Sequence, residues 1–237
     1  MKAVILAGGL GTRLKPFTEV IPKPLLPIGD GEKAIIEVQI DHLKTDGFTK
    51  IYIATNYKSK YIESYLGDGS KFGIQIQFSL EEKRLGTVGP ISLLKEELNE
   101  PFLLMNGDIL TKANFNDVYQ FGLTHSDSLL TVATKEIITP FHFGIVSTEG
   151  NYIKNVEEKP DFKTEILAGI YIMKPDIMNY IGYNEQMDIN DLILNMLNKN
   201  EKITRYLLNE YWIDIGQYDD YSRAKEDFKK MWPGKND

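Results

Sequence analysis

Cysteine is absent from the 237 residues of this chain. Disulfide frameworks, thiolate metal sites and a cysteine nucleophile are therefore excluded. Long hydrophobic runs are absent as well, because the apolar stretch at residues 1–7 leads directly into two glycines. That stretch is too short for the core of a signal peptide and far too short to span a bilayer. We expect a cytoplasmic protein without membrane contacts.

Basic residues are also fewer than acidic residues. The chain has 27 lysine and arginine residues against 34 carboxylates, with a formal net charge of -7. A broad nucleic-acid surface is not expected, because such surfaces bind phosphates through clustered Lys and Arg. The three histidines are scattered and are expected to be structural. The balance of 42% hydrophobic and 26% charged residues is typical of an ordinary globular protein.

The hydrophobic pattern of the first half predicts an α/β unit. β-Rich runs at residues 2–7, 50–54, 74–78 and 102–106 alternate with helical patterns at 34–45, 58–66 and 88–98. This alternation favours a Rossmann-like, doubly wound sheet flanked by helices.

After residue 108 strands dominate the pattern, so that a mixed sheet with a β-rich second half is expected. The expected strands lie at residues 128–134, 144–147, 152–156, 166–173 and 211–215, and the expected helices at 114–125, 175–180, 189–198 and 218–231. The length fits one hydrophobic core, so residues 1–237 are predicted to form a single domain.

The most informative stretch follows the first β-rich run. Residues 6–14 read Leu-Ala-Gly-Gly-Leu-Gly-Thr-Arg-Leu, and residues 22–25 read Pro-Lys-Pro-Leu. Glycines at a strand end let backbone N–H groups approach an anion closely. Arg13 adds a guanidinium fork for phosphate oxygens, and Lys23 adds a compact charge between two prolines. We predict a phosphate-binding loop here.

Two other phosphate motifs do not fit this loop. A P-loop requires a Gly-Lys-Ser/Thr ending, which the loop lacks, and a dinucleotide fingerprint requires glycine where the chain has Leu14. A nicotinamide-dependent dehydrogenase is therefore disfavoured.

Residues 6–13 and 22–25 together resemble the signature of the sugar-phosphate nucleotidyltransferase family, Gly-Gly-x-Gly-Thr-Arg followed by Pro-Lys-Pro. Segments at residues 85–87, 106–108, 157–160, 168–171 and 212–216 are similar to the family in the same order. The resemblance implies a GT-A-like nucleotidyltransferase fold. It also implies an enzyme that joins a nucleoside triphosphate to a sugar 1-phosphate and releases pyrophosphate. The nucleotide-binding half is expected at about residues 1–112 and the sugar-phosphate-binding half at 113–237.

The resemblance also implies individual roles. Arg13, Lys23 and Lys159 are expected to be catalytic by offsetting phosphate charge. The expected nucleotide contacts are Leu6, Ala7, Gly8, Gly9, Gly11, Thr12, Arg13, Lys23, Glu81, Gly86, Thr87, Asn106 and Gly107. The expected sugar-phosphate contacts are Gly144, Glu158, Lys159 and Gly169. Ammonium and carboxylate groups suit a phosphate and sugar hydroxyls respectively.

Asp108 and Asp214 each end an apolar run. Open α/β sheets bind ligands at the carboxyl ends of their strands. The resemblance implies that this pair holds Mg²⁺, the expected cofactor. Two carboxylates with substrate phosphates and water are a usual setting for Mg²⁺ beside a nucleotide.

Residues 81–90 bear on the base. They read Glu-Glu-Lys-Arg-Leu-Gly-Thr-Val-Gly-Pro, and residues 85–90 are similar to the Leu-Gly-Thr-Ala-Gly-Pro segment of guanylyltransferases for mannose and related heptose or hexosamine phosphates. A carboxylate at Glu81 or Glu82 suits the N–H donors of guanine. GTP is the favoured triphosphate.

Other assignments stay open at this point. CTP with phosphocholine, or UTP or dTTP with a hexose 1-phosphate, would keep the chemistry and change the partners. A non-catalytic regulatory subunit is disfavoured, since the metal and phosphate residues are all present. The sequence determines neither the sugar nor the oligomeric state, and a homo-oligomer is among the options.

Overall fold

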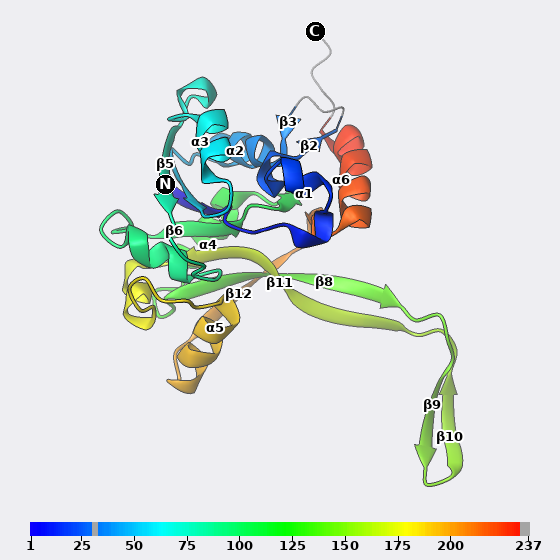
Figure 1. Ribbon diagram of the computed structural model, residues 1–237. Helices are drawn as coiled ribbons and strands as arrows, with labels where there is room; N and C mark the ends of the chain where they lie inside the picture. Colours follow the sequence, from blue (N-terminus) through cyan, green and yellow to red (C-terminus); the bar gives the residue numbers. More distant parts are fainter. Residues whose placement is uncertain (30–32, 233–237) are drawn as a thin grey trace.

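The computed structural model of the chain describes residues 1–29 and 33–232 (Figure 1). A seven-stranded sheet with the order β12-β8-β11-β6-β1-β4-β5 forms its centre. Its strands are β1 (Lys2–Leu6), β4 (Lys50–Thr55), β5 (Gln75–Leu80), β6 (Phe102–Asn106), β8 (Leu130–Pro140), β11 (Asp161–Met173) and β12 (Ile203–Leu208). β11 runs against its neighbours β6 and β8, and the other adjacent pairs are parallel. The predicted mixed α/β sheet is confirmed.

Three two-stranded pairs complete the β-structure, namely β2 (Pro27–Ile28) with β3 (Lys33–Ala34), β7 (Ile109–Thr111) with β13 (Trp212–Asp214), and β9 (Ile145–Glu149) with β10 (Tyr152–Glu157). The α-helices are α1 (Phe17–Val20), α2 (Ile35–Thr45), α3 (Ser59–Leu66), α4 (Phe115–Thr124), α5 (Ile189–Asn198) and α6 (Tyr218–Met231). Within the described ranges, none of the helices is long and apolar enough to cross a membrane.

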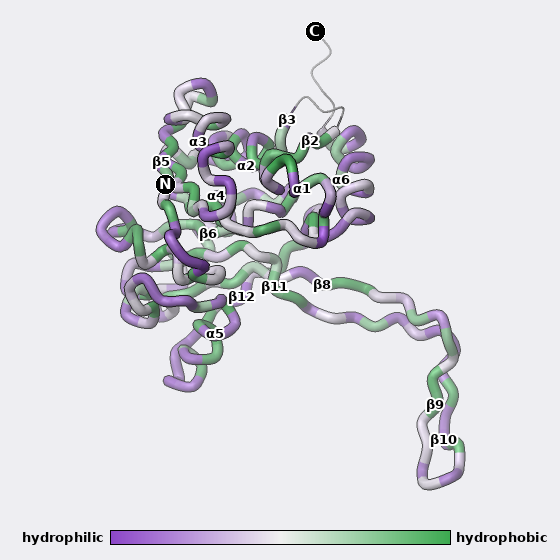
Figure 2. Tube along the Cα trace, in the orientation of Figure 1, coloured by the Kyte–Doolittle hydropathy of each residue, from purple (hydrophilic) through white to green (hydrophobic). Residues whose placement is uncertain are grey.

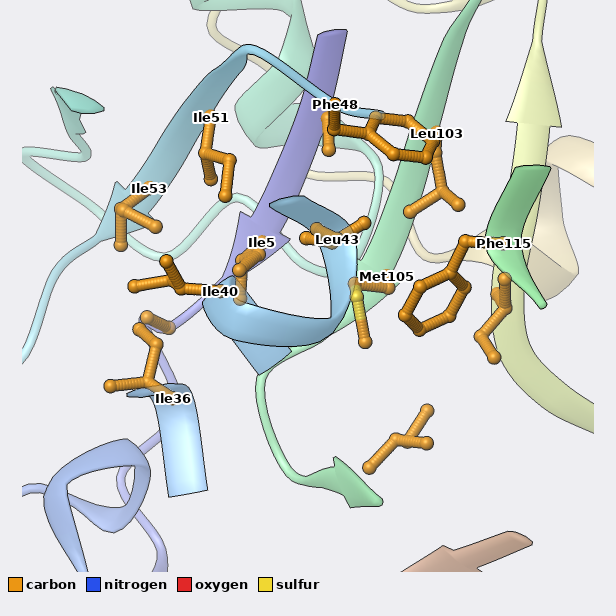
Figure 3. Packing of buried hydrophobic residues seen from close by; sticks show 14 of the residues in the cluster. Ile5, Ile36, Ile40, Leu43, Phe48, Ile51, Ile53, Leu103, Met105 and Phe115 are labelled. Carbon is orange, nitrogen blue, oxygen red and sulfur yellow. The ribbon is translucent and has the colours of Figure 1, made fainter. Parts of the chain in front are cut away.

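Helices cover both faces of the sheet, because successive strand residues point to opposite sides. Ile5 of β1 belongs to a core with α2, α3 and α4, where Ile40 and Leu43 of α2 pack near Met105 (Figure 3). Val4, the preceding residue, faces a second core with α5. A third cluster joins the loop after β1 to α2, β13 and α6. This last cluster brings α6 next to the loop after β1.

The helix predicted at residues 88–98 does not form as an α-helix. The chain forms the 3₁₀ turn η4 (Gly89–Leu94) there, although Ile91 and Leu94 are buried as the pattern requires. The Ser92 hydroxyl donates to the Gly89 carbonyl at 2.7 Å and so competes for an acceptor that an α-helix would use. Pro90 stands in the first turn, where a missing N–H removes no helical hydrogen bond.

The strands at residues 128–134 and 166–173 are longer than predicted, since β8 and β11 continue together well beyond the sheet. They form a two-stranded arm that leaves the body at the carboxyl edge and ends in the β9–β10 hairpin (Figure 1). Apolar and polar residues alternate along this arm without any layer of the protein covering it (Figure 2). The residues of β9 and β10 are accordingly exposed, except for a half-buried Ile145.

Candidate active site

The loop after β1 lies at the carboxyl edge of the sheet. Gly11 has a positive φ of 62° and begins the 3₁₀ turn η1 (Thr12–Leu14). A Cβ on Gly11 would lie 2.7 Å from Cγ2 of Thr18, whose hydroxyl donates to the Gly11 carbonyl at 2.8 Å. Glycine is required at this position, because a larger residue meets both strain and a clash. The turn leaves Thr12 and Arg13 exposed beside the loop.

Two aspartates meet a lysine at the same edge. Nζ of Lys23 donates to Oδ2 of Asp108 at 2.5 Å, and both side chains are largely buried. The pairing of β13 with β7 sets Asp214 opposite Ile109, next to Asp108 in the chain. Burial, and then the negative charge of Asp108, raise the pKa of Asp214 to about 6, against the opposing charges of Lys23 and Arg13. The cluster therefore joins residues from three distant parts of the sequence.

This cluster fits a divalent cation. Oδ1 of Asp108 and Oδ1 of Asp214 are buried and have no hydrogen-bond partner in the part of the chain that the structure describes. Buried carboxylate oxygens without donors are costly, so a bound cation would satisfy them. Within residues 1–29 and 33–232, no group of three or more His, Asp or Glu side chains is placed to hold a metal. Substrate phosphates and water would have to supply the other ligands, as is usual for Mg²⁺.

A pocket of about 240 Å³ opens beside Asp108. Eight of the predicted site residues line it, namely Leu6, Gly8, Gly9, Glu81, Gly86, Thr87, Asn106 and Asp108. Ala7 and Gly107 do not line it. Ala7 is buried, and the Gly107 N–H donates to the Leu6 carbonyl at 2.9 Å, an oxygen that a Cβ on Gly107 would approach to 2.5 Å. The structure thus gathers most of the predicted nucleotide contacts at one edge.

Glu81 is the buried member of the two candidate glutamates, with 7% exposure, whereas Glu82 is exposed. Oε2 of Glu81 accepts from the Leu85 N–H at 3.1 Å. Oε1 lies 2.8 Å from the position that a Cβ on Gly8 would take, so it faces the loop side of the pocket. Burial raises the pKa of Glu81, and the Leu85 N–H and Arg84 lower it in part.

Four further residues line the pocket, namely Asn56, Arg84, Leu85 and Asp188. Asn56 directly follows β4, so the strand-end argument that found Asp108 would also have found it. Asp188 carries a helix-capping pattern before α5, which explains why sequence reasoning assigned it no site role. Its Oδ1 also accepts from the Thr87 N–H at 3.0 Å. It therefore holds residues 86–87 in place.

The turn that carries Asp108 is held from below by Gln39 of α2. This side chain is buried, and its Nε2 donates to the carbonyls of Asn106 at 3.0 Å and of Ile109 at 2.8 Å. The two acceptors lie on either side of Asp108, so a single amide fixes the turn. A buried glutamine inside a helix gives no sequence signal for this role.

Gly169 belongs to the same region. β11 bulges between Leu167 and Tyr171, and Gly169 has a φ of 67° there. A Cβ on it would lie 2.7 Å from Nδ2 of Asn106. Glycine at this position lets β11 approach the pocket edge closely.

The other predicted sugar-phosphate residues lie elsewhere, on the arm. Gly144 and Glu158 are neighbours, since a Cβ on Gly144 would lie 3.1 Å from Oε2 of Glu158. Nζ of Lys159 lies 3.6 Å from Oε1 of Glu158, and both side chains are exposed. They occupy the bend between the β8–β11 ladder and the β9–β10 hairpin (Figure 1). Within one chain, the structure does not bring these three residues to the aspartates.

The geometry can be set against known proteins. The family model described as "Nucleotidyl transferase" matches residues 2–231. The chain belongs to the nucleotidyl transferase family. It is similar to a mannose-1-phosphate guanyltransferase from Neurospora crassa, with 34% identity over 93% of this chain and 62% of that protein. A mannose-1-phosphate guanyltransferase from Kluyveromyces lactis is 33% identical over 100% of this chain and 69% of its own length. This family member thus spans about two thirds of those relatives.

Solved structures of similar fold include HddC from Yersinia pseudotuberculosis, with a TM-score of 0.74, 27% identity, and coverage of 96% of this chain and 99% of that one. HddC has also been solved in complex with GMP-PN. A Bacillus anthracis protein, provisionally named a glucose-1-phosphate thymidylyltransferase and bound to sucrose, has a TM-score of 0.78 and 25% identity over 98% of this chain and 96% of that one. The nucleotidyltransferase fold expected from the motifs is confirmed.

Proposed function

We propose that this family member is a guanylyltransferase that makes a GDP-sugar and pyrophosphate from GTP and a sugar 1-phosphate of the mannose, manno-heptose or hexosamine type. The observation that carries the proposal is the cluster of Lys23, Asp108 and Asp214 beside the glycine-lined pocket, with one orphaned oxygen on each aspartate. The relatives named as mannose-1-phosphate guanyltransferases support the substrate class.

In the proposed reaction, an oxygen of the sugar 1-phosphate forms a bond to the α-phosphorus of GTP. The bond from that phosphorus to the bridging oxygen breaks, and its electron pair leaves with pyrophosphate. The sugar phosphate is already ionised near neutral pH, so no side chain has to take a proton. No covalent intermediate on the enzyme is required.

Catalysis then rests on positioning and charge. Backbone N–H groups of the loop at Gly8, Gly9 and Gly11 would cradle the triphosphate. Lys23 and Arg13 would offset the charge that builds up during transfer. Asp108 and Asp214 would hold Mg²⁺, which when bound supplies further positive charge to the phosphates. Lys159 and Glu158 are proposed to hold the sugar phosphate.

The choice of guanine rests on Glu81. Guanine presents the N1 and N2 donors along one edge, and a carboxylate that faces the pocket accepts from both. Thymine and uracil present one such donor between two carbonyl oxygens, which a carboxylate repels. A second possibility is the same reaction with UTP or dTTP and a hexose 1-phosphate. The similarity to the Bacillus anthracis protein favours this alternative.

The test is pyrophosphate release by the purified chain with Mg²⁺, when each of GTP, CTP, UTP, dTTP and ATP is combined with mannose, glucose, glucosamine or manno-heptose 1-phosphate or with phosphocholine. Release with GTP and one mannose-type sugar is expected. Release with another triphosphate would contradict the role of Glu81 and keep the chemistry. No release of pyrophosphate with any pair of substrates would contradict the proposed function.

A further inference from the structure

The arm is a stiff projection rather than a hinged flap. Its ladder pairs Asp161 with Pro140 and continues residue by residue to Leu167 opposite Thr134, without a bulge. At about 3.3 Å per residue, the run from 161 to 167 carries the bend roughly 20 Å from the body. An uninterrupted ladder of this kind is stiff. The segment at its far end, which holds Glu158 and Lys159, therefore cannot reach the active site of the same chain.

The root of the arm is also braced. Nζ of Lys135 donates to the carbonyls of Leu208, Asn209 and Glu210 at 3.2, 3.2 and 2.7 Å. On the other strand, Glu165 accepts two bonds from the guanidinium of Arg205 in β12. Folding the arm back over its own body would break these contacts on both strands.

The end of the arm carries apolar side chains that nothing in the chain covers. Val146, Tyr152, Ile153 and Val156 of the hairpin are between 51% and 78% exposed. At the bend, Phe143 is 72% exposed and packs edge-on against Phe141. The strand pairing places Val146, Ile153 and Val156 on one face of the hairpin and Tyr152 on the other. A two-stranded hairpin is marginally stable in water by itself, and exposed apolar side chains that share one face indicate an interface.

The body has an uncovered apolar surface of its own. A groove of about 490 Å³ beside the phosphate loop is lined by Phe17, Val20, Ile21 and Tyr218, among others, and Val20 is 70% exposed. A second groove of about 690 Å³ continues from it along α3. In Figure 1, α1 and α6 lie far from the tip of the same chain's arm. One chain therefore has two apolar surfaces that it cannot bring together.

We propose that the arm of each chain packs on the body of a second copy, in the groove beside its phosphate loop, in a two-fold symmetric dimer. Lys159 and Glu158 of one copy then complete the active site of the other. This last part rests on the proposed function, whereas the exchange of arms does not.

Charge supports a second copy as the occupant. Residues 136–165 of the arm carry six carboxylates against three lysines. The grooves are edged by the cations Lys60 and Lys225. Opposite charges at the rim of an apolar contact favour the pairing and its register. A reciprocal exchange also closes on itself, so that both arms and both grooves are covered and no filament forms.

The decisive experiment is complementation between two impaired chains, assayed at a sugar 1-phosphate concentration far below the raised KM of the Lys159→Ala chain. Asp108→Asn and Lys159→Ala chains with different affinity tags are co-expressed, and the mixed dimer is isolated by two successive affinity steps. If arms are exchanged, one of its two sites has both Asp108 and Lys159. The mixed dimer should then release pyrophosphate at about half the wild-type rate, far above either parent. If each arm serves its own body, the mixed dimer has no intact site, and a rate at the level of the parents would overturn the proposal.

A second measurement does not depend on activity. Light scattering should give the mass of a dimer for the wild-type chain and of a monomer for the double variant Ile153→Ser, Val156→Ser, with unchanged thermal unfolding of the body. The control Lys154→Ser on the same hairpin should stay dimeric, since its side chain is exposed and forms an ion pair with Glu149 of its own chain. A monomeric wild type would overturn the exchange even if the enzyme is active. A wild type that is dimeric through its arms but silent with every substrate would instead overturn the proposed function alone.

Discussion

The carboxyl edge of the sheet and the arm both carry residues that the sequence motifs assign to one site, yet they differ in almost every physical respect. At the edge, Lys23 and Glu81 are buried and their charged groups have defined partners. On the arm, Glu158 and Lys159 are exposed and contact mainly each other. In the packed region, the side chains of the site are held in place before substrate binds. On the uncovered arm, a partner has to hold them in place. The difference predicts that edge residues control chemistry and base, and arm residues control the second substrate.

The largest effect is expected at the edge. Asp108→Asn removes one of the two metal carboxylates and the partner of Lys23, so kcat should fall by on the order of a thousandfold at every Mg²⁺ concentration. Rates of pyrophosphate release across an Mg²⁺ series check this, and chelation of the metal should silence the wild type as well. Asp219→Asn, which changes an exposed aspartate in the first turn of α6, is the matched control. Activity retained in Asp108→Asn would remove Asp108 from the metal site.

The next effect tests the arm. Lys159→Ala should raise the KM for the sugar 1-phosphate by about a hundredfold, because one charge-assisted contact is lost, and should leave the KM for GTP unchanged. Steady-state kinetics with each substrate varied in turn provide the measurement. Lys154→Ala removes an equally exposed lysine from the same arm and should change neither constant. A change in the GTP constant alone would contradict the division between edge and arm.

Glu81→Gln should change only the preference for the base of the triphosphate. The carboxamide keeps the shape and loses the charge that favours the two guanine donors, so kcat/KM for GTP should fall about ten- to a hundredfold. The preference for GTP over UTP should narrow by the same factor. Glu82→Gln changes the exposed neighbour and is the control. Equal losses with both triphosphates would show that Glu81 only supports the fold of the pocket.

The contrast between edge and arm also explains what the sequence could predict. Helices α5 and α6 agree with the predicted bounds, because their apolar periodicity reflects one buried face. Strand β6 agrees as well, because it is a continuous apolar run that is buried on both faces of the sheet. Strand β12 was not predicted, since it lies at the edge of the sheet and most of its residues are only half-buried. The length of β8 was underestimated, because residues 135–140 are held by partners in β11 that are distant in the sequence.

The same limit applies to the site. Motif order along the chain pointed to Asp108, Asp214 and the glycine loop. The ends of β1 and β6 meet at one edge of the central sheet, and the pairing of β13 with β7 adds Asp214 there. Motif order does not reveal that Glu158 and Lys159 lie on a projection, since local sequence does not encode where a long hairpin points. Gln39 was missed for a related reason. Its partners are backbone carbonyls, which leave no trace in the sequence.

Gln39 gives the smallest effect and the finest test of the packed edge. Gln39→Leu keeps the volume of the side chain but leaves the carbonyls of Asn106 and Ile109 without their donor. The Asp108 turn should loosen, and the Mg²⁺ concentration for half-maximal rate should rise about tenfold, the range typical of residues that orient metal ligands. Gln120→Leu, on the exposed face of α4, is the control. A purely structural role would instead lower the melting temperature and the yield without changing the metal dependence. A shifted Mg²⁺ curve at saturating GTP, with the KM for the sugar phosphate unchanged, would therefore identify Gln39 as a positioning residue for the edge.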